Sequence, residues 1–406
     1  MNRAARPKSK VVFVLGAGFS IPAGAPPQAA ILNEIFRLDI RDDRFRKARE
    51  ALRASLRDDL RIDPAKCEDA ALEDIYTPID RCIADGTALK GKSVFDLVNI
   101  RADLEYLISI AIARRIRSHL DADPVASRYV DDFAHYVVEK AARRADLAKD
   151  AHSSAPAKAY DPVSIISLNW DILLDNALHS TLGQRDPHFT GDYDPFGVVD
   201  YCCYISSLDR DDPRIRSGLW SLGCRGYNVK LLKLHGSMNW LQCPNCQRLF
   251  VKFGFKEDIL NRVGTARCRH CEKVGYDNPL AGSLVMPTFL KDLSNFQIKL
   301  VWQNAGVELM EASRIIFIGY SQPHADFEFR QLLSRMVHKD AAIDVVLRKG
   351  RGADAVRRYA AEKERYEQFF GKRKMDFHSG GVVDFVRSLT AVPSAAKKSG
   401  HPRHRG

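Results

Sequence analysis

Val11-Val12-Phe13-Val14-Leu15-Gly16-Ala17-Gly18, close to the start of the chain, indicates the architecture better than any other stretch. Its β-branched and aromatic residues predict a buried strand over Lys10–Leu15, and the glycines predict a tight turn. The segment Gln28–Leu38 that follows is typical of a helix. Strand, glycine turn and helix together form the phosphate-binding start of a nucleotide-binding α/β unit, because glycine lets the main chain approach a pyrophosphate. The turn is not a full G-x-G-x-x-G motif, so by itself it is weak evidence.

A signal peptide is the competing interpretation of this region, because Arg3, Arg6, Lys8 and Lys10 precede the apolar run. Gly16 and Gly18 interrupt that run, which favours the strand and turn.

Four later segments are expected to add parallel strands, at 163–168, 229–234, 314–318 and 343–347. Three of them end in polar or glycine-bearing clusters: Asn169-Trp170-Asp171, His235 and Gly319-Tyr320-Ser321. The carboxyl ends of parallel strands meet at one edge of a sheet, where α/β proteins bind their ligands. We therefore expect the three clusters to converge on one site.

The region from Ile40 to Asp150 is mostly charged and has helical spacing. Leu104, Leu107, Ile108, Ala111 and Ile112 form one apolar stripe, which indicates core or partner-helix packing. Ala151–Ala159 is typical of a linker.

Four cysteines form two C-x2-C pairs, Cys243 with Cys246 and Cys268 with Cys271. This spacing is typical of a tetrahedral zinc site, and a redox pair or a disulfide framework is the alternative. Four thiolates leave no position for water, so we expect the Zn²⁺ to be structural. The chain has nine cysteines, and this odd, scattered set favours a reducing compartment, here the cytoplasm.

The 406 residues carry a formal charge of +11, and no apolar run approaches the length of a membrane span. We therefore expect no membrane contact. A basic balance allows contact with nucleic acid, but a solvated surface is the favoured explanation, so any such contact is expected to be indirect.

The motifs, taken in order, resemble those of the sirtuin-like NAD-consuming family. They are Gly16-Ala17-Gly18-Phe19-Ser20 with Pro22 and Gly24, Asn169-Trp170-Asp171, His235-Gly236-Ser237, the four cysteines and Gly319-Tyr320-Ser321. The five elements span residues 11–321, which is most of the chain.

The resemblance implies a role for each matching residue. His235 would be the general base on the nicotinamide-ribose hydroxyls, and Asn169 would position the ribose and the attacking water. Asp171 would lie near the carboxamide or brace its loop. The implied NAD-binding residues are Gly16, Ala17, Gly18, Ser20, Pro22, Gly24, Asp171, Gly319 and Ser321. The implied zinc ligands are Cys243, Cys246, Cys268 and Cys271.

The chain also departs from the protein-deacylating sirtuins. Those enzymes have Asp-Phe-Arg where this chain has Pro27-Gln28-Ala29, and they have Gln in place of Leu168. The segment 319–326 is similar to the Gly-Tyr-Ser-x-Pro-x-x-Asp form of divergent bacterial sirtuin-like proteins that hydrolyse NAD in antiphage defence. The resemblance therefore implies an NAD+ glycohydrolase (NAD+ nucleosidase) that forms nicotinamide and ADP-ribose. A non-catalytic module binding NAD, ADP-ribose or nucleic acid and an NAD-dependent protein deacylase remain alternatives.

The expected fold is α/β, with a Rossmann-like parallel sheet, helices on both faces, a large helical insertion and a small four-cysteine zinc module. Residues 1–30, 160–240 and 276–390 would form the NAD-binding domain, and 31–159 the helical insertion and oligomerisation region. Residues 241–275 would form a zinc-ribbon-like module, and 391–406 a disordered basic tail. The resemblance also implies control through a homo-oligomer or through a partner such as a helicase-type ring ATPase, because an unrestrained NAD hydrolase would kill its host.

Overall fold

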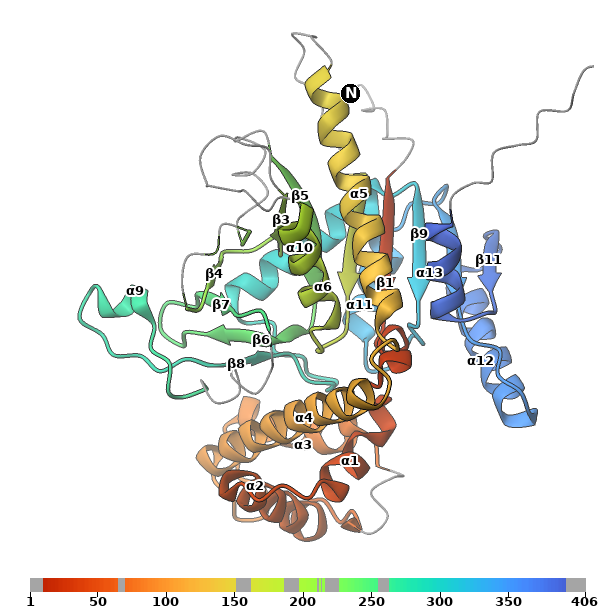
Figure 1. The fold of residues 1–406 in the computed structure, drawn as a ribbon. Coiled ribbons are helices and arrows are strands. Elements are labelled where there is room, and N and C mark those ends of the chain that lie inside the picture. The colour runs from red at the N-terminus through yellow and green to blue at the C-terminus, as the bar shows by residue number, and fades with distance from the viewer. Residues whose placement is uncertain are drawn as a thin grey trace, which may run out of the picture.

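The computed structural model describes eight ranges of the chain (Figure 1). They are residues 10–64, 70–150, 162–185, 197–209, 212, 214–215, 226–254 and 263–391, with side chains described up to Ala142 in the second range. The expected linker at 151–159 and the expected tail beyond residue 391 lie outside them.

A seven-stranded sheet in the order β11-β10-β9-β1-β2-β5-β3 forms the centre of the molecule (Figure 1). Every neighbouring pair in this sheet is parallel. Its strands are β1 (Val11–Leu15), β2 (Val163–Ser167), β3 (Gly197–Asp200), β5 (Tyr227–Lys233), β9 (Arg314–Ile318), β10 (Ala342–Val346) and β11 (Met375–His378). The expected Rossmann-like parallel sheet is therefore confirmed, with β3 and β11 as two strands that the sequence reading did not contain.

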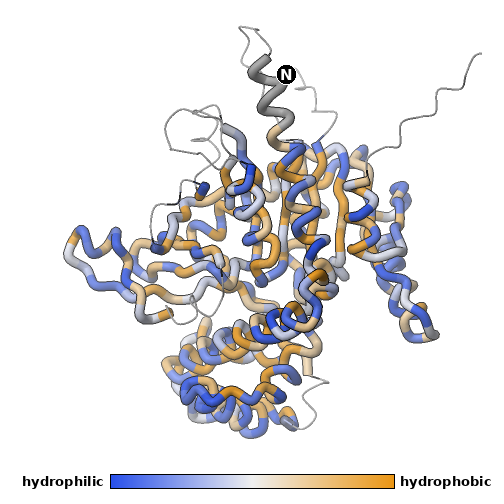
Figure 2. Tube along the Cα trace, viewed as in Figure 1, coloured by the Kyte–Doolittle hydropathy of each residue, from blue (hydrophilic) through white to orange (hydrophobic). Residues whose placement is uncertain are grey.

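Helices cover both faces of this sheet, as expected. On one face Phe13 of β1 packs edge-on against Phe133 of α5 (Arg128–Asp150), with ring centroids 5.0 Å apart. On the other face Phe317 of β9 packs against Tyr366 of α12 (Ala353–Phe370), at 5.3 Å. Hydrophobic residues follow the central strands, as the orange tube in Figure 2 shows, because a parallel sheet is buried on both sides. The remaining helices around it are α6 (Leu173–Arg185), α10 (Phe296–Glu311), α11 (Phe327–Met336) and α13 (Val382–Thr390).

A helical module with its own hydrophobic core lies between β1 and α5 in the sequence. It consists of α1 (Ile31–Arg37), α2 (Asp43–Ala54), the π-helical turn η4 (Ser55–Asp59), α3 (Leu72–Asp85) and α4 (Val94–Ala122). The stripe from Leu104 to Ile112 belongs to this core. A capping box between Ser93 and Asp96 starts α4 by satisfying free N–H groups. Helix α5 falls in the range expected for the insertion, but its side chains pack on the central sheet.

A second, four-stranded sheet has the order β4-β7-β6-β8. Its strands are β4 (Ile205–Ser207), β6 (Gly236–Gln242), β7 (Leu249–Val251) and β8 (Ala281–Leu284). Strand β6 begins directly after His235 and ends directly before Cys243, so one strand connects the central sheet edge to the cysteine cluster. Of the helices that the structure describes, none has both the length and the hydrophobicity to cross a bilayer.

Candidate functional site

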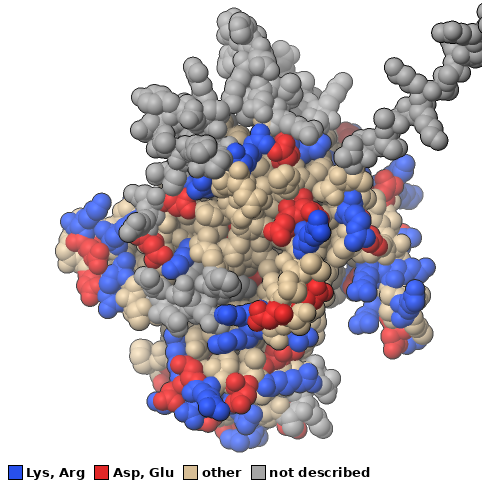
Figure 3. Space-filling view, viewed as in Figure 1, with Lys and Arg blue, Asp and Glu red and all other residues tan. Residues whose placement is uncertain are grey.

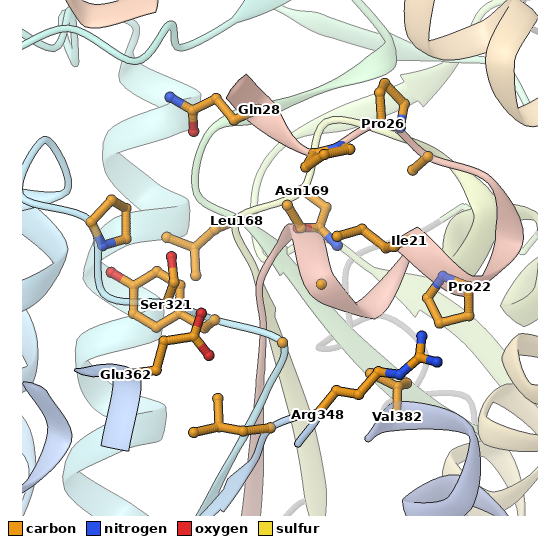
Figure 4. Close-up of a pocket in the computed structure, with 18 of the residues that line it drawn as sticks. Ile21, Pro22, Pro26, Gln28, Leu168, Asn169, Ser321, Arg348, Glu362 and Val382 are labelled. Atoms are coloured by element: carbon orange, nitrogen blue, oxygen red, sulfur yellow. The ribbon is translucent and has the colours of Figure 1, made fainter. Parts of the chain in front are cut away.

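A cavity of ≈ 650 Å³ lies at the carboxyl edge of the central sheet (Figure 4). It is lined by the segments that follow β1, β2, β5, β9 and β10. The chain proceeds from β1 to β2 on one side and later places β9 on the other side of β1, which makes a topological switch point. Open α/β sheets bind ligands at such a point, because the loops diverge there.

Two glycine loops form the floor of the cavity. Gly16 donates its N–H to Ile318 at 3.0 Å, and Gly18 donates to Gly319 at 2.9 Å. Gly319 has φ +63°, and a Cβ there would lie 2.4 Å from the carbonyl carbon of Gly18. No side chain fits between the loops, so the main chain itself faces the cavity at Gly18 and Gly319.

Ala17 and Pro22 also line the cavity, whereas Ser20 and Gly24 do not. Ser20 is buried beneath the turn. Gly24 ends the short 3-10 turn Ile21–Ala23 with φ +93°, and a Cβ there would lie 2.3 Å from Cβ of His119 on α4. The glycine turn therefore touches the helical module directly.

Asn169 lies two residues after the end of β2, on a loop held by hydrogen bonds. Its main-chain N–H donates to Oγ of Ser167 at 3.2 Å, and its Nδ2 donates to Oγ of Ser20 at 3.3 Å. Its Oδ1 is buried and has no hydrogen-bond partner in the described part of the chain. The side chain is thus fixed by its amide nitrogen and presents an open acceptor.

Asp171 continues the same loop and lines the cavity. Its carboxylate accepts the N–H of Leu173 at 3.1 Å, and its main-chain oxygen accepts a bond from Lys233 at 2.6 Å. Lys233 also donates to the carboxylate of Asp175 at 2.9 Å, and both side chains are about 1% exposed. Tyr201 donates to the other oxygen of Asp175 at 2.8 Å. Sequence reasoning missed this buried ion pair, because Lys233 and Asp175 are 58 residues apart and belong to separate elements.

His235 follows β5 and is buried against the loop of Asn169. Its Nδ1 donates to the main-chain oxygen of Leu168 at 3.2 Å. Its Nε2 has no hydrogen-bond partner among the described residues, and the nearest carboxylate oxygen, from Asp326, is 3.7 Å away. Burial lowers the pKa of His235 below its usual 6.5, while the charge of Asp326 opposes this shift. The neutral imidazole is therefore the favoured form near neutral pH.

Asp326 and Lys291 complete the charged surroundings of His235, and sequence reasoning gave neither of them a role. Asp326 precedes α11 and lines the cavity. The ammonium of Lys291 lies 3.5 Å from Asp326 and 3.1 Å from Glu328. Asp326 could have been singled out from its place in the segment 319–326, but Lys291 lies in a stretch without a motif.

The opposite wall of the cavity comes from β10, α12 and α13. It includes Arg348, Arg358, Glu362 and Val382, and Ser321, which follows β9, lies in the same view (Figure 4). Of these residues only Ser321 was expected, because the end of β10 carries no recognisable motif.

The structure thus brings His235, Asn169, Asp171, Ala17, Gly18, Pro22, Gly319 and Ser321 to one cavity, whereas Gly16, Ser20 and Gly24 do not line it.

The four cysteines of the two C-x2-C pairs lie together beyond β6. Their sulfur atoms are all within 4.8 Å of one another, and Cys243–Cys271 and Cys246–Cys268 are each 3.6 Å apart. Sulfurs arranged tetrahedrally about 2.3 Å from a zinc ion would be about 3.8 Å apart, so the cluster fits one Zn²⁺. The predicted grouping of the four cysteines is confirmed. None of the four lines the cavity, which agrees with a structural metal.

No protein-family model and no curated protein matches the chain. It is similar to a solved structure described as "The Structural basis of Sirtuin Substrate Affinity", with 12% identity and a TM-score of 0.37, over 96% of this chain and 94% of that chain. It is also similar to "Structure of Sir2Tm bound to a propionylated peptide", with 12% identity and a TM-score of 0.34, over 94% of this chain and 91% of that one. TM-scores this low establish no common activity.

Proposed function

We propose that this protein is a sirtuin-like NAD+ glycohydrolase, which binds NAD+ in the cavity and hydrolyses its nicotinamide–ribose bond. One observation carries the proposal. Nε2 of His235 and Oδ1 of Asn169 are buried, lack hydrogen-bond partners among the described residues, and belong to side chains that line the same cavity. Buried polar atoms are nearly always hydrogen-bonded, so both atoms are expected to bond a ligand or a water molecule in the cavity.

The two glycine loops suit the pyrophosphate of a dinucleotide. Gly18 and Gly319 leave the main chain bare at the cavity floor, where a Cβ would collide with the facing loop. Phosphate groups approach such exposed main chain closely. The nicotinamide ribose would then lie toward His235 and Asn169, and the adenosine half toward Ser321 and α12.

His235 has the hydrogen-bond pattern of a general base. Because Nδ1 donates its proton to Leu168, the lone pair of the neutral ring is on Nε2, the atom without a partner. Nε2 can accept a proton from a ribose hydroxyl, and the carboxylate of Asp326 would stabilise the resulting imidazolium. A positioned base of this kind typically contributes ~10²–10⁴-fold to the rate.

Asn169 would orient the water. Its free Oδ1 can accept a hydrogen bond from a water molecule and direct the oxygen toward the anomeric carbon. Bond cleavage passes through an oxocarbenium-like state, as in glycoside hydrolysis. The pyridinium leaves as neutral nicotinamide without needing a proton, the water supplies the new hydroxyl of ADP-ribose, and one proton is released.

The deciding experiment measures nicotinamide and ADP-ribose formed from NAD+ by the purified protein, with and without an acyl-lysine peptide. We expect His235→Ala and Asn169→Ala each to lower turnover ~10²-fold or more. His324→Ala is the matched control, because His324 is exposed and does not line the cavity. Turnover that requires the peptide would favour the deacylase, and tight binding without product would favour a non-catalytic module.

We further propose that the enzyme is a regulated effector of antiphage defence by NAD+ depletion, acting as a homo-oligomer or with a partner such as a helicase-type ring ATPase. The helical module supports this, because Ile112 of α4 lines the cavity and Gly24 abuts His119. Phe95 and Val98 expose 73% and 45% of their surface on the same helix and are candidate contact residues.

Two measurements test this role. Phe95→Glu with Val98→Glu is expected to lower the oligomer mass in light scattering. Cells carrying the His235→Ala variant are expected to lose protection against phage, and equal protection would contradict the proposed role.

A further inference from the structure

The cavity wall formed by β10 and α12 carries two arginines and one acidic residue, Glu362. Arg348 follows β10 and Arg358 lies on α12, and both line the cavity. Neither guanidinium makes a hydrogen bond or ion pair with another residue that the structure describes. Charged side chains lining a cavity are candidates for binding an ion of opposite charge.

The surrounding sequence increases this positive charge. Lys349 and Arg351 belong to the same loop. Asp354 is the one acid between residues 348 and 358, and it is already paired with Arg357. Figure 3 shows Lys and Arg side chains gathered over α12 at the right of the view. Helix α12 as a whole carries as many acidic as basic residues, so the excess positive charge that would attract an anionic group comes from the loop 348–351.

The backbone holds Arg348 in place. Leu347 donates to His378 at 2.9 Å, and Lys349 donates to Ser379 at 3.0 Å, so hydrogen bonds flank the arginine on both sides. A Cβ on Gly381 would lie 3.4 Å from Cβ of Arg348, which shows that the aliphatic stem of the arginine packs along this glycine. The cation is thus attached to a fixed strand end.

The one acidic side chain on this wall is Glu362, which follows Arg358 by one turn of α12 and interacts with it electrostatically. In Figure 4 the guanidinium of Arg348 is turned toward Pro22 and Val382 and away from Glu362. A guanidinium suits a phosphate, to which arginine donates charge-assisted hydrogen bonds.

In nucleotide-binding sheets, an acidic residue binds the free 2′-hydroxyl of the adenosine ribose, whereas a nearby arginine accommodates a 2′-phosphate. We propose that Arg348 and Arg358 form a subsite for this 2′-phosphate, so that the protein prefers 2′-phosphorylated dinucleotides, the NADP+ class, to NAD+. The inference rests on the proposed function, because it names the substrate class of the same cavity.

Calorimetry with adenosine 2′,5′-bisphosphate and 5′-AMP tests the subsite without requiring turnover. The wild type is expected to bind the bisphosphate about 10-fold or more tightly than AMP, because hydrogen bonds to a charged group are among the stronger ones. Arg348→Ala and Arg358→Ala are each expected to reduce this ratio at least ~5-fold. Arg357→Ala is the matched control, since Arg357 is paired with Asp354 and does not line the cavity, and it should keep the wild-type ratio.

Three results would overturn the subsite: equal affinity of the wild type for both ligands, binding of neither, or an equal loss for both in Arg348→Ala. The last would mean that the arginine binds a phosphate common to both ligands. Turnover of NADP+ and NAD+ is measured separately. A retained bisphosphate preference without turnover would contradict the glycohydrolase and support the subsite. Turnover of NAD+ without that preference would support the glycohydrolase and contradict the subsite.

Discussion

The ammonium of Lys233 donates a hydrogen bond of 2.6 Å to the main-chain oxygen of Asp171, between residues 62 positions apart in the chain. Lys233 is two residues before His235, and Asp171 is two residues after Asn169. The bond therefore joins the two loops that carry the proposed catalytic side chains. Asp175 neutralises the lysine, which makes this buried connection possible.

Lys233→Met is expected to lower the free energy of unfolding by about 3–5 kcal/mol, because it leaves the carboxylate of Asp175 buried without its cation. Turnover should fall as well, since the loop of Asn169 loses its anchor. Urea denaturation and NAD+ turnover measure the two effects. Lys363→Met is the control, because Lys363 and Glu367 are 42% and 49% exposed and such a pair contributes about 1 kcal/mol or less. Equal losses in both variants would contradict the anchoring role.

The pH dependence of turnover should follow His235. The neutral ring is the base, and burial holds its pKa below 6.5, so turnover should be full at neutral pH and fall as the pH drops through that lowered pKa. The pH profile of kcat/KM measures this limb. A limb centred above 6.5 would be inconsistent with the buried neutral base.

Two charge-removing variants should move this limb in opposite directions. Asp326→Asn removes a charge that raises the pKa of His235, so the limb should move to lower pH. Lys291→Met removes a charge that lowers this pKa, so the limb should move to higher pH. Asp340→Asn is a suitable control, because Asp340 is exposed and pairs with His338. A limb that stays in place in both variants would exclude His235 as the titrating group.

Gly319→Ala should abolish ligand binding. It should also lower stability by more than its backbone angle alone explains. Gly319 and Gly86 have φ +63° and +67°, so alanine at either position costs about 1–2 kcal/mol in backbone energy. Only at Gly319 would the Cβ collide with the facing loop, whereas Gly86 has open space around it. Thermal unfolding and ADP-ribose binding compare the variants, and wild-type binding by Gly319→Ala would refute the two-loop floor.

Zinc analysis by mass spectrometry is expected to find one zinc ion per chain. Cys268→Ser should lose the metal and lower the melting temperature, and Cys82→Ser should keep both, because Cys82 lies outside the cluster. Turnover should fall together with the metal, because β6 connects Cys243 to His235. A metal-free variant with unchanged stability would show that the cluster does not support this strand.

The central strands and the cysteine cluster were predictable because their signals are local. The apolar run at 11–15 and the C-x2-C spacing at 243–246 each fit into one short window of sequence. The strands predicted at 163–168, 229–234, 314–318 and 343–347 agree with β2, β5, β9 and β10 to within two residues at each end. The convergence of their carboxyl ends then follows from the parallel topology.

Contacts between distant residues were not predictable in this way. Lys233 pairs with Asp175, and Lys291 lies beside Asp326, only because the fold brings separate segments together. Helix α5 has the same charged, helical spacing as the module before it, and nothing in its sequence shows that Phe133 faces the sheet. Strand β11 is a short, partly exposed edge strand with weak periodicity.

The order of the chain has a consequence for its synthesis. The cavity is lined by residues from Ala17 to Val382, and its glycine floor needs Gly18 and Gly319 together. A ribosome makes the first of these long before the last, so a nascent chain released before β10, α12 and α13 would lack a complete cavity wall. For a protein proposed to consume an essential cell metabolite, truncated translation products would then be harmless.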